Sequence, residues 1–180
     1  MKALCFREHG ELEQINYEDV PKPECKPHEV LIEIKACALN HLDIWIRRGW
    51  PSLSLEKPHW CGADISGVVA DIGNCVKERK VGQRVVVCPG ISMKSDEFTQ
   101  RGEDSLSPHY AILGEHLRGG AAEFIAVPAD STKIMPDDLD FVEGAAPLLV
   151  TLTAWRMLIN RARLKAGENV LIIGAGGGVN

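Results

Sequence analysis

Three polar side chains in the first half of the chain could take part in hydrogen bonding or proton transfer. Asn40 and Asp43 follow the end of a predicted strand, on the turn that begins a short helix, and Asp64 opens a later strand. Asn40 could donate a hydrogen bond to a substrate oxygen, and either carboxyl group could relay a proton if burial raised its pKa. A structural role is the alternative, because Asp43 could cap the helix and Asp64 could orient a backbone amide or an arginine.

His41, beside Asn40, is the fourth candidate for acid–base chemistry. Its imidazole titrates close to neutral pH, which suits proton transfer. A single histidine beside the start of a helix is, however, more often a structural or surface group. Both interpretations stay open on the sequence alone.

A glycine-rich segment near the C-terminal end could bind phosphate. The apolar run 169–173 is typical of a strand buried on both faces of a parallel sheet, and Gly174, Gly176, Gly177 and Gly178 follow it. Such a turn lets backbone amides approach a pyrophosphate at the start of the next helix. The fingerprint alone is a weak signal, and a flexible glycine tail is the alternative.

Composition narrows the class of protein. The chain has 180 residues, with 20 Lys and Arg against 25 Asp and Glu and a net charge of −5. The two signs are interspersed, so we expect no nucleic-acid partner. No apolar run approaches the ~18 residues that span a bilayer, so we expect no membrane segment and a cytoplasmic location. The six cysteines form no C-x-x-C pair, which favours reduced thiols over disulfides or a zinc site of that type.

The elements that must position these residues are mainly strands. In the run 29–37, Val30, Ile32 and Ile34 fall on one face, and Glu33 and Lys35 fall on the other. Further short strands are predicted over 2–7, 12–17, 65–72, 84–88, 122–127 and 132–135. This spacing favours a small barrel or sandwich. Residues 89–120 form a long polar stretch with no sustained period, which is uncommon in a compact domain.

Helical signals begin after residue 136. Asp140 and Glu143 predict an N-cap with its capping-box partner, and Pro147 limits how far that helix runs unbent. A second helix follows, in which apolar side chains recur at helical spacing. We expect this stripe to pack against a neighbouring element; its members are Leu148, Leu152, Trp155 and Ile159.

Taken in order, several motifs resemble the medium-chain dehydrogenase/reductase family, whose members have a GroES-like catalytic barrel followed by a Rossmann domain. The resemblance covers the whole chain. The matching stretches are 38–43 with 47–49, 62–69, 81–85, 112–116, 122–124, 152–155 and the glycine-rich turn. It implies a mainly β fold with some α: a GroES-like β-barrel over 1–139, connecting helices over 140–165, and the first strand and turn of a truncated Rossmann domain over 166–180.

The resemblance also implies which metal sites are lost. Zinc-dependent relatives hold a catalytic metal at positions that match Asn40, Ala63 and Leu149, and neither alanine nor leucine can ligate zinc. The cysteines of the family's structural zinc lobe match Met93, Asp96, Thr99 and Ser107. We therefore expect no zinc, and a segment 93–106 that is mobile or held only by side-chain contacts. A residual zinc site at Cys37, His41 and Cys61 is a minor alternative.

By the same resemblance, Asn40, Asp43 and Asp64 line a substrate cleft, and Thr153 lies near the nicotinamide of NAD or NADP. Thr153 could equally bond its own helix backbone. Without zinc, a quinone or enone is an easier hydride acceptor than a simple carbonyl, because the charge spreads into an enolate or hydroquinone anion. We expect a parent enzyme that reduces such small molecules. Alcohol dehydrogenation without catalytic zinc, or a stand-alone β-barrel with a binding role, are the alternatives.

A Rossmann domain needs several strands and the helix behind the glycine turn. We therefore expect this 180-residue chain alone to bind no dinucleotide and to be inactive, and the parent to be a homo-oligomer. The apolar run from Val170 to Ile173 is expected to be disordered, to fold back, or to let the chain associate with a second copy.

Overall fold

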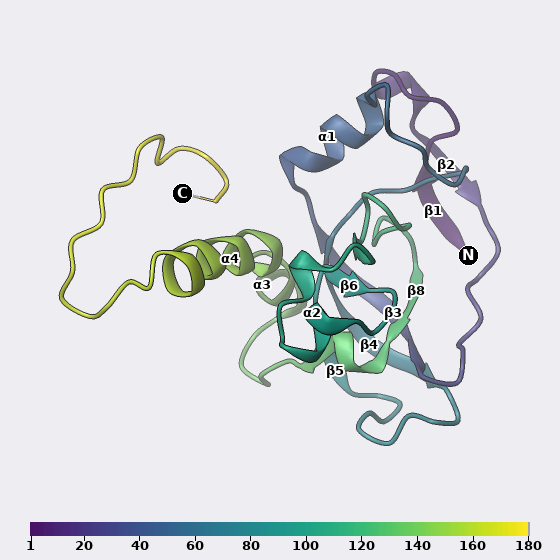
Figure 1. Cartoon of the computed structure of the whole chain (residues 1–180). Coiled ribbons are helices and arrows are strands. Elements are labelled where there is room, and N and C mark those ends of the chain that lie inside the picture. Colours follow the sequence, from purple (N-terminus) through teal and green to yellow (C-terminus); the bar gives the residue numbers. More distant parts are fainter. Residues whose placement is uncertain (180) are drawn as a thin grey trace.

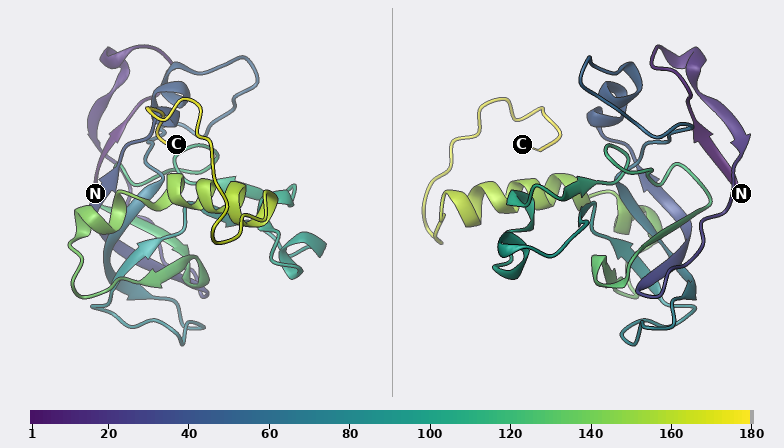
Figure 2. Two further views of the ribbon diagram at one scale, coloured as in Figure 1. Left: turned by 90° about the vertical axis from the view of Figure 1, so that its left-hand side faces the viewer. Right: turned by 45° about the vertical axis from the view of Figure 1, so that its right-hand side comes forward.

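The computed structural model describes residues 1–179; Asn180, the last residue of the predicted 166–180 segment, lies outside the described residues. The strands and helix α1 (His41–Arg48) form one body, and the helices near the C-terminal end project away from it (Figure 1). The remaining C-terminal segment runs beyond those helices (Figure 2). The functional candidates are therefore divided between the body and this projection.

A five-stranded antiparallel sheet is the centre of the body. Its order is β8-β3-β4-β5-β9, and its strands are β8 (Phe124–Pro128), β3 (Glu29–Ala38), β4 (Asp64–Ile72), β5 (Arg84–Val87) and β9 (Thr132–Ile134). The prediction of a mainly β fold with some α is confirmed. The closed barrel is not observed among residues 1–179, because β8 and β9 lie at opposite ends of the strand order and each has one neighbour.

The core lies on the face of the sheet that the alternation in β3 predicts. Val30 and Ile32 have no exposed surface, and they pack with Ile65, Val69 and residues of β5 and β8. The alternation is not strict, since Leu31 is also buried. Two shifts in the β3–β4 register, at 31/32 and 34/36, account for this because each extra residue changes the face that the next side chain meets.

Two small sheets complete the β structure: β1 (Lys2–Cys5) pairs with β2 (Asn16–Asp19), and β6 (Gly90–Ser92) pairs with β7 (Tyr110–Ile112). The strand predicted over 12–17 is partly wrong. A 3-10 turn, η1 (Leu12–Gln14), occupies its first half, and β2 begins only at Asn16. Leu12 is 71% exposed, so its apolar side chain marks no buried strand face here.

The polar stretch 89–120 has structure of its own, held by side chains. Between β6 and β7 lie the short helix α2 (Glu97–Gln100) and the 3-10 turn η2 (Asp104–Leu106). Asp96 accepts from the amides of Phe98 and Thr99 at 2.9 and 3.0 Å, and from Ser107 Oγ at 2.6 Å. The Asp96 amide donates to Thr99 Oγ1 at 2.8 Å. Three of the positions that the resemblance matches to zinc-binding cysteines thus bond to one another.

The helices after residue 140 begin as predicted. Asp140 Oδ1 accepts from the Glu143 amide at 2.8 Å, and Glu143 Oε2 accepts from the Asp140 amide at 3.0 Å, which confirms the capping box of α3 (Phe141–Ala145). Pro147 separates α3 from α4 (Leu148–Trp155), and a π-helix, η4 (Arg156–Arg161), continues α4. Buried Gly144 and Ala145 lie on α3, which packs on β3 and β4.

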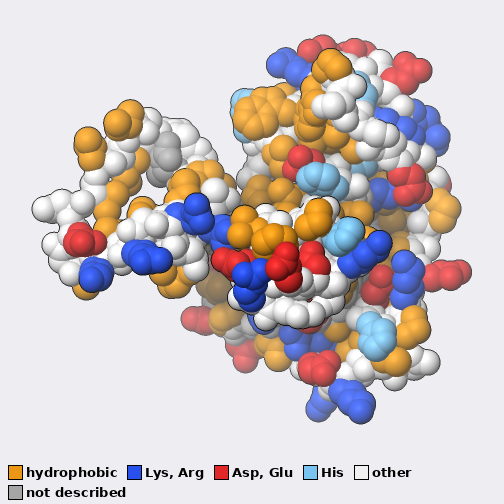
Figure 3. Space-filling view, in the orientation of Figure 1, with side chains coloured by type: hydrophobic (Ala, Val, Ile, Leu, Met, Phe, Trp, Pro, Cys, Tyr) orange, Lys and Arg blue, Asp and Glu red, His pale blue; other side chains and the backbone are white. Residues whose placement is uncertain are grey.

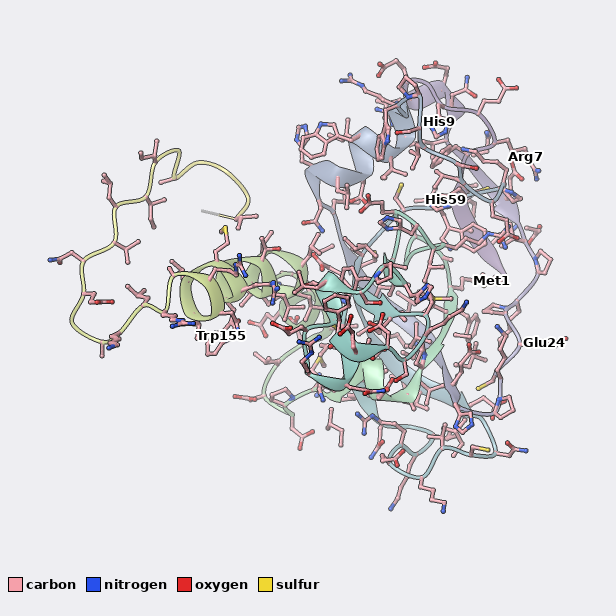
Figure 4. The ribbon with its side chains drawn as sticks, viewed as in Figure 1. Met1, Arg7, His9, Glu24, His59 and Trp155 are labelled. Atoms are coloured by element: carbon pink, nitrogen blue, oxygen red, sulfur yellow. The ribbon has the colours of Figure 1, made fainter. Side chains whose placement is uncertain are left out.

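The apolar stripe of α4 is not packed as predicted. Leu152, Trp155 and Ile159 are 48%, 60% and 41% exposed, because α4 meets the body mainly at its N-terminal end. Trp155 is labelled on the projecting helix in Figure 4. By length and composition the helical stretch Phe141–Arg161 could cross a membrane, contrary to the expectation of no such run, although only 11% of its most apolar window is buried.

The strand predicted over 169–173 is also not observed. Leu171 is 85% exposed, and the segment forms no strand with β1 to β9. A strand meant to be buried on both faces needs strands on either side and helices above and below. The described residues supply none of these around 169–173. The glycines that follow form a turn, in which the Gly177 amide donates to the Gly174 carbonyl at 2.9 Å.

Candidate functional site

The pairing of β3 with β4 brings Asn40 and Asp64 together. Ala38, the last residue of β3, lies opposite Asp64, the first residue of β4. The turn that leaves β3 therefore passes beside the start of β4, and Asn40 Nδ2 donates to Asp64 Oδ2 at 2.8 Å. Because an ionised carboxylate only accepts, this bond determines that the NH2 end of the Asn40 amide faces Asp64.

Asp64 also binds the N-terminal end of α4. Its second oxygen, Oδ1, accepts from the Leu149 amide at 2.7 Å, and Asp64 is 1% exposed. Leu149 is the second residue of α4, so its amide has no partner within the helix. A carboxylate at this end of a helix is also favoured by the helix dipole. Asp64 thus holds the β3–α1 turn and α4 to the start of β4.

Asp43 has a separate pair of backbone partners. Its Oδ2 accepts from the Asn40 amide at 2.7 Å, and its Oδ1 accepts from the Gly62 amide at 3.0 Å. The structural interpretation of Asp43 as a helix cap is therefore supported by geometry, with an additional tie to the segment before β4. Asn40 bonds to both acids, to Asp43 through its backbone and to Asp64 through its side chain.

Burial dominates the electrostatics of these acids. It raises the pKa of Asp43, while the hydrogen bonds from the Asn40 and Gly62 amides act in the opposite direction. Burial likewise raises the pKa of Asp64, against the bonds from Asn40 and Leu149. A carboxyl group whose pKa is raised in this way is better suited to exchanging a proton near neutral pH than an exposed one.

Two thiols lie in the same region. Burial, with a smaller contribution from Asp43, raises the pKa of both Cys37 and Cys61 to about 12. The Cys61 thiol also approaches the Asp43 carbonyl oxygen at 3.7 Å. Thiols with such pKa values stay protonated at neutral pH and are poor nucleophiles.

A catalytic zinc does not fit the residues at the matching positions. Asn40 directs an NH2 group at Asp64, Ala63 is buried with no donor atom, and Leu149 offers only a backbone amide that already donates. Within residues 1–179, no three His, Cys, Asp or Glu side chains come together in a way that could hold a metal ion. The chemistry of this donor set is that of hydrogen bonding.

The other candidates lie apart from this network. His41 is exposed, and its ring meets Trp45 edge-on with 4.9 Å between centroids. Thr153 Oγ1 donates to the Leu149 carbonyl at 2.9 Å, which is the backbone-bonding alternative. The predicted cofactor-binding glycines, 174 and 176–178, lie on the C-terminal segment beyond α4 (Figure 1). With no strand before them and no helix described behind them, residues 166–179 do not form a dinucleotide cradle.

A cleft of about 940 Å³ adjoins the network at Leu149. Leu149, Leu152 and Thr153 of α4 line one side, and segments of the 89–112 region and β9 line the other. Asn40, Asp43 and Asp64 are not among its lining residues. Leu149 therefore belongs to both places, because its backbone is bound by Asp64 while the residue also borders the cleft.

Sequence reasoning missed several polar residues that only the folded chain gathers. Lys133, Arg156 and Arg161 line the cleft, although they are far apart in sequence or on different predicted helix faces. His59 is buried in the body (Figure 4). Its Nε2 lies 3.0 Å from the Gly114 carbonyl oxygen, and burial lowers its pKa. No local pattern marks such contacts between distant segments.

Comparisons with known proteins agree with this architecture. Residues 26–137 match the family described as alcohol dehydrogenase GroES-like domain. The chain is 33% identical to a quinone oxidoreductase of Rattus norvegicus and 36% identical to a crotonyl-CoA carboxylase/reductase of Cereibacter sphaeroides. The alignments cover 99% and 98% of this chain but 47% and 43% of those proteins. The chain thus spans about half the length of the curated relatives it matches.

Solved structures give the same result. The crystal structure of an NAD-dependent alcohol dehydrogenase superposes with a TM-score of 0.95 at 43% identity, over 99% of this chain and 52% of that one. A cobalt- and zinc-bound thermostable alcohol dehydrogenase from Pyrobaculum aerophilum superposes with a TM-score of 0.88 at 30% identity, over 99% and 53%. The chain therefore belongs to the alcohol dehydrogenase GroES-like domain family, within the medium-chain dehydrogenases/reductases.

Proposed function

We propose that this chain is the catalytic-domain part of an NAD(P)-dependent oxidoreductase that works without catalytic zinc and reduces a quinone, an enone or a related conjugated carbonyl. The observation that carries the proposal is the donor set around Asp64. At the three positions where zinc-dependent relatives are expected to hold metal, the chain has an amide that donates to Asp64, a buried alanine and a leucine. Stabilisation of the reduced substrate must then come from hydrogen bonds or from charge delocalisation.

Conjugated acceptors suit that constraint best. Hydride adds to carbon, and the resulting negative charge spreads over an enolate or a hydroquinone anion, so a single strong Lewis acid is not required. The names of two relatives, a quinone oxidoreductase and a crotonyl-CoA carboxylase/reductase, indicate acceptors of this kind. The nicotinamide cofactor, when bound, supplies the hydride.

Within the chain, Asn40 is the group that we assign to the substrate oxygen. One of its amide hydrogens is directed to Asp64, which fixes the plane of the amide and leaves the second hydrogen for a ligand. Asp64 acts as a positioning residue in this scheme, because both its oxygens already accept hydrogen bonds. Asp43 is occupied in the same way, so we assign it the helix cap and the Gly62 tie rather than proton transfer.

Oxidation of an alcohol without catalytic zinc is the second candidate. It is favoured by the 43% identity to the NAD-dependent alcohol dehydrogenase. Under either activity, we propose that the 180-residue chain alone transfers no hydride, because residues 166–179 do not form a dinucleotide cradle.

The test compares the full product of the gene with the 180-residue chain. Both are assayed with NADH and NADPH against 1,4-benzoquinone, crotonyl-CoA and a simple aldehyde, and zinc is measured by elemental analysis. We expect the full product to reduce a conjugated acceptor, to keep its activity in EDTA and to hold well under one zinc per chain. Stoichiometric zinc with EDTA-sensitive turnover would overturn the proposal, and turnover of alcohols alone would favour the second candidate.

A further inference from the structure

The cleft beside α4 gathers positive charge that no acid neutralises. Lys133 of β9 and Arg156 and Arg161 of η4 line it, and within residues 1–179 none of the three forms an ion pair or a side-chain hydrogen bond. Two acids, Asp104 and Asp130, also line the cleft. The net charge of its lining is therefore positive, although the whole chain carries −5. Lys and Arg side chains lie along the projecting helix and where it meets the body in Figure 3.

The π-helix is what places the two arginines on the same side. In an α-helix, residues five apart are separated by about 140° around the axis, since each residue turns the chain by about 100°. A π-helix bonds residue i to residue i+5, so residues five apart lie one turn apart on one face. Arg156 and Arg161 are the first and last residues of η4, and the Ala162 amide donates to the Met157 carbonyl at 2.8 Å in that register. Such π segments occur frequently at functional sites.

The rest of the cleft is apolar and aromatic. Leu152, Trp155 and Met157 line the helix side, and Tyr110 and Leu106 line the opposite side. Arg156 acts on the hydroxyl of Tyr110 across this space: burial raises the pKa of that hydroxyl, and the positive charge of Arg156 partly offsets the effect. The volume of about 940 Å³ is within the range of small-molecule sites.

We propose that this cleft binds an organic anion, with its phosphate or carboxylate group at Arg156, Arg161 and Lys133 and its apolar body against Trp155, Leu152 and Tyr110. Arginine is well suited to the anionic group because its planar guanidinium donates two parallel hydrogen bonds. Thr153 and Leu149 border the same cleft, so an anionic carbonyl compound bound there would lie close to the network at Asp64. That last step rests on the proposed function, whereas binding of the anion does not.

Binding is tested on the 180-residue chain without a cofactor, by titration calorimetry at low ionic strength. The probes are 1-naphthyl phosphate, 2-naphthoate, neutral 2-naphthol and inorganic phosphate. We expect naphthyl phosphate or naphthoate to bind about tenfold more tightly than naphthol, and the difference to shrink at 0.5 M salt, where charges are screened. The phosphate and carboxylate probes distinguish the two possible anionic groups. Equal affinity for naphthol and both anions would overturn the proposal.

Variants locate the site. R156Q/R161Q removes two charges from the cleft, and the matched control K77Q/K80Q removes two from an exposed loop outside it. We expect the first pair to weaken binding of the anion by about tenfold and the control pair by less than twofold. K133Q, on the opposite wall, should weaken it independently. An equal loss in R156Q/R161Q and K77Q/K80Q would reduce the effect to net charge and refute a specific site. Circular dichroism checks that each variant is folded.

Discussion

Replacing Asp64 by asparagine should loosen the attachment of α4 to the sheet. The carboxylate accepts two bonds, from Asn40 Nδ2 at 2.8 Å and from the Leu149 amide at 2.7 Å, while being 1% exposed. In D64N one of the two acceptor atoms becomes an NH2 group. Either Asn40 or Leu149 then meets a donor where an acceptor had been, and that donor is left buried without a partner.

The magnitude follows from these contacts. An unsatisfied buried donor costs roughly 1–3 kcal/mol, and each lost bond to a charged group is worth roughly 1.5–3 kcal/mol before the cost of burying the charge is returned. We therefore expect D64N to lower the free energy of unfolding by about 2 kcal/mol, measured by urea denaturation at pH 7. N40A removes only one of the two bonds and should cost about 1 kcal/mol.

The pH dependence gives an independent check. The folded pKa of Asp64 is raised by burial, so the folded state binds more protons than the unfolded state above the ordinary value of 3.8. The stabilising contribution of the protonated form is complete below 3.8 and is lost as pH rises through the folded pKa. D64N does not titrate, so its penalty relative to the wild type should become smaller as pH rises above 3.8.

Hydrogen exchange at the start of α4 identifies the cause. The Leu149 amide is protected in the wild type by its bond to Asp64, and it should exchange faster in D64N while amides in β3 and β5 do not. A double-mutant cycle with N40A should show coupling, because the two residues share one bond. Unchanged stability together with unchanged exchange at Leu149 would refute the assignment of Asp64 as a helix-anchoring group.

Three further predictions concern other parts of the chain. D96A should speed amide exchange in the 93–107 segment, and in the wild type that segment should lose order as pH falls below 3.8, because the bond from the Ser107 hydroxyl lowers the folded pKa of Asp96; slow exchange in D96A would contradict this. Iodoacetamide at pH 8 should label exposed Cys75 within minutes and leave Cys37 and Cys61, with pKa values of about 12, unlabelled until the chain unfolds, as mass spectrometry can verify. L171S should abolish any concentration-dependent self-association seen by analytical ultracentrifugation, since this side chain is 85% exposed; a dimer that persists rules out the 170–173 run as its interface.

The sequence was sufficient wherever a structure depends on neighbouring residues. The alternation in 29–37 located β3 and its buried face, and Asp140 with Glu143 located the start of α3, because strand faces and helix caps are determined within a few residues. The contacts of Asp64 could be stated only as alternatives. Their outcome depends on the pairing of Ala38 with Asp64, which is a property of the sheet and not of either segment.

Other predictions failed because they assumed contacts that the described residues do not supply. The run 169–173 and the stripe containing Trp155 have the composition of buried elements, yet both are exposed here. Composition reports what a segment prefers to contact, and the structure reports what it meets. The gathering of Arg156 and Arg161 was missed for the opposite reason, since helical spacing was assumed to be that of an α-helix throughout.

The π register of η4 also makes the exact length of this helix consequential. A π-helix accommodates one residue more per turn than its α-helical neighbour, roughly as if a residue had been inserted. Deletion of a single residue between 156 and 161 would allow the segment to relax to an α-helix and would rotate everything that follows by about 100°. Insertions and deletions here would therefore re-aim the whole C-terminal segment, so homologous sequences should vary in residue type at these positions more readily than in residue number.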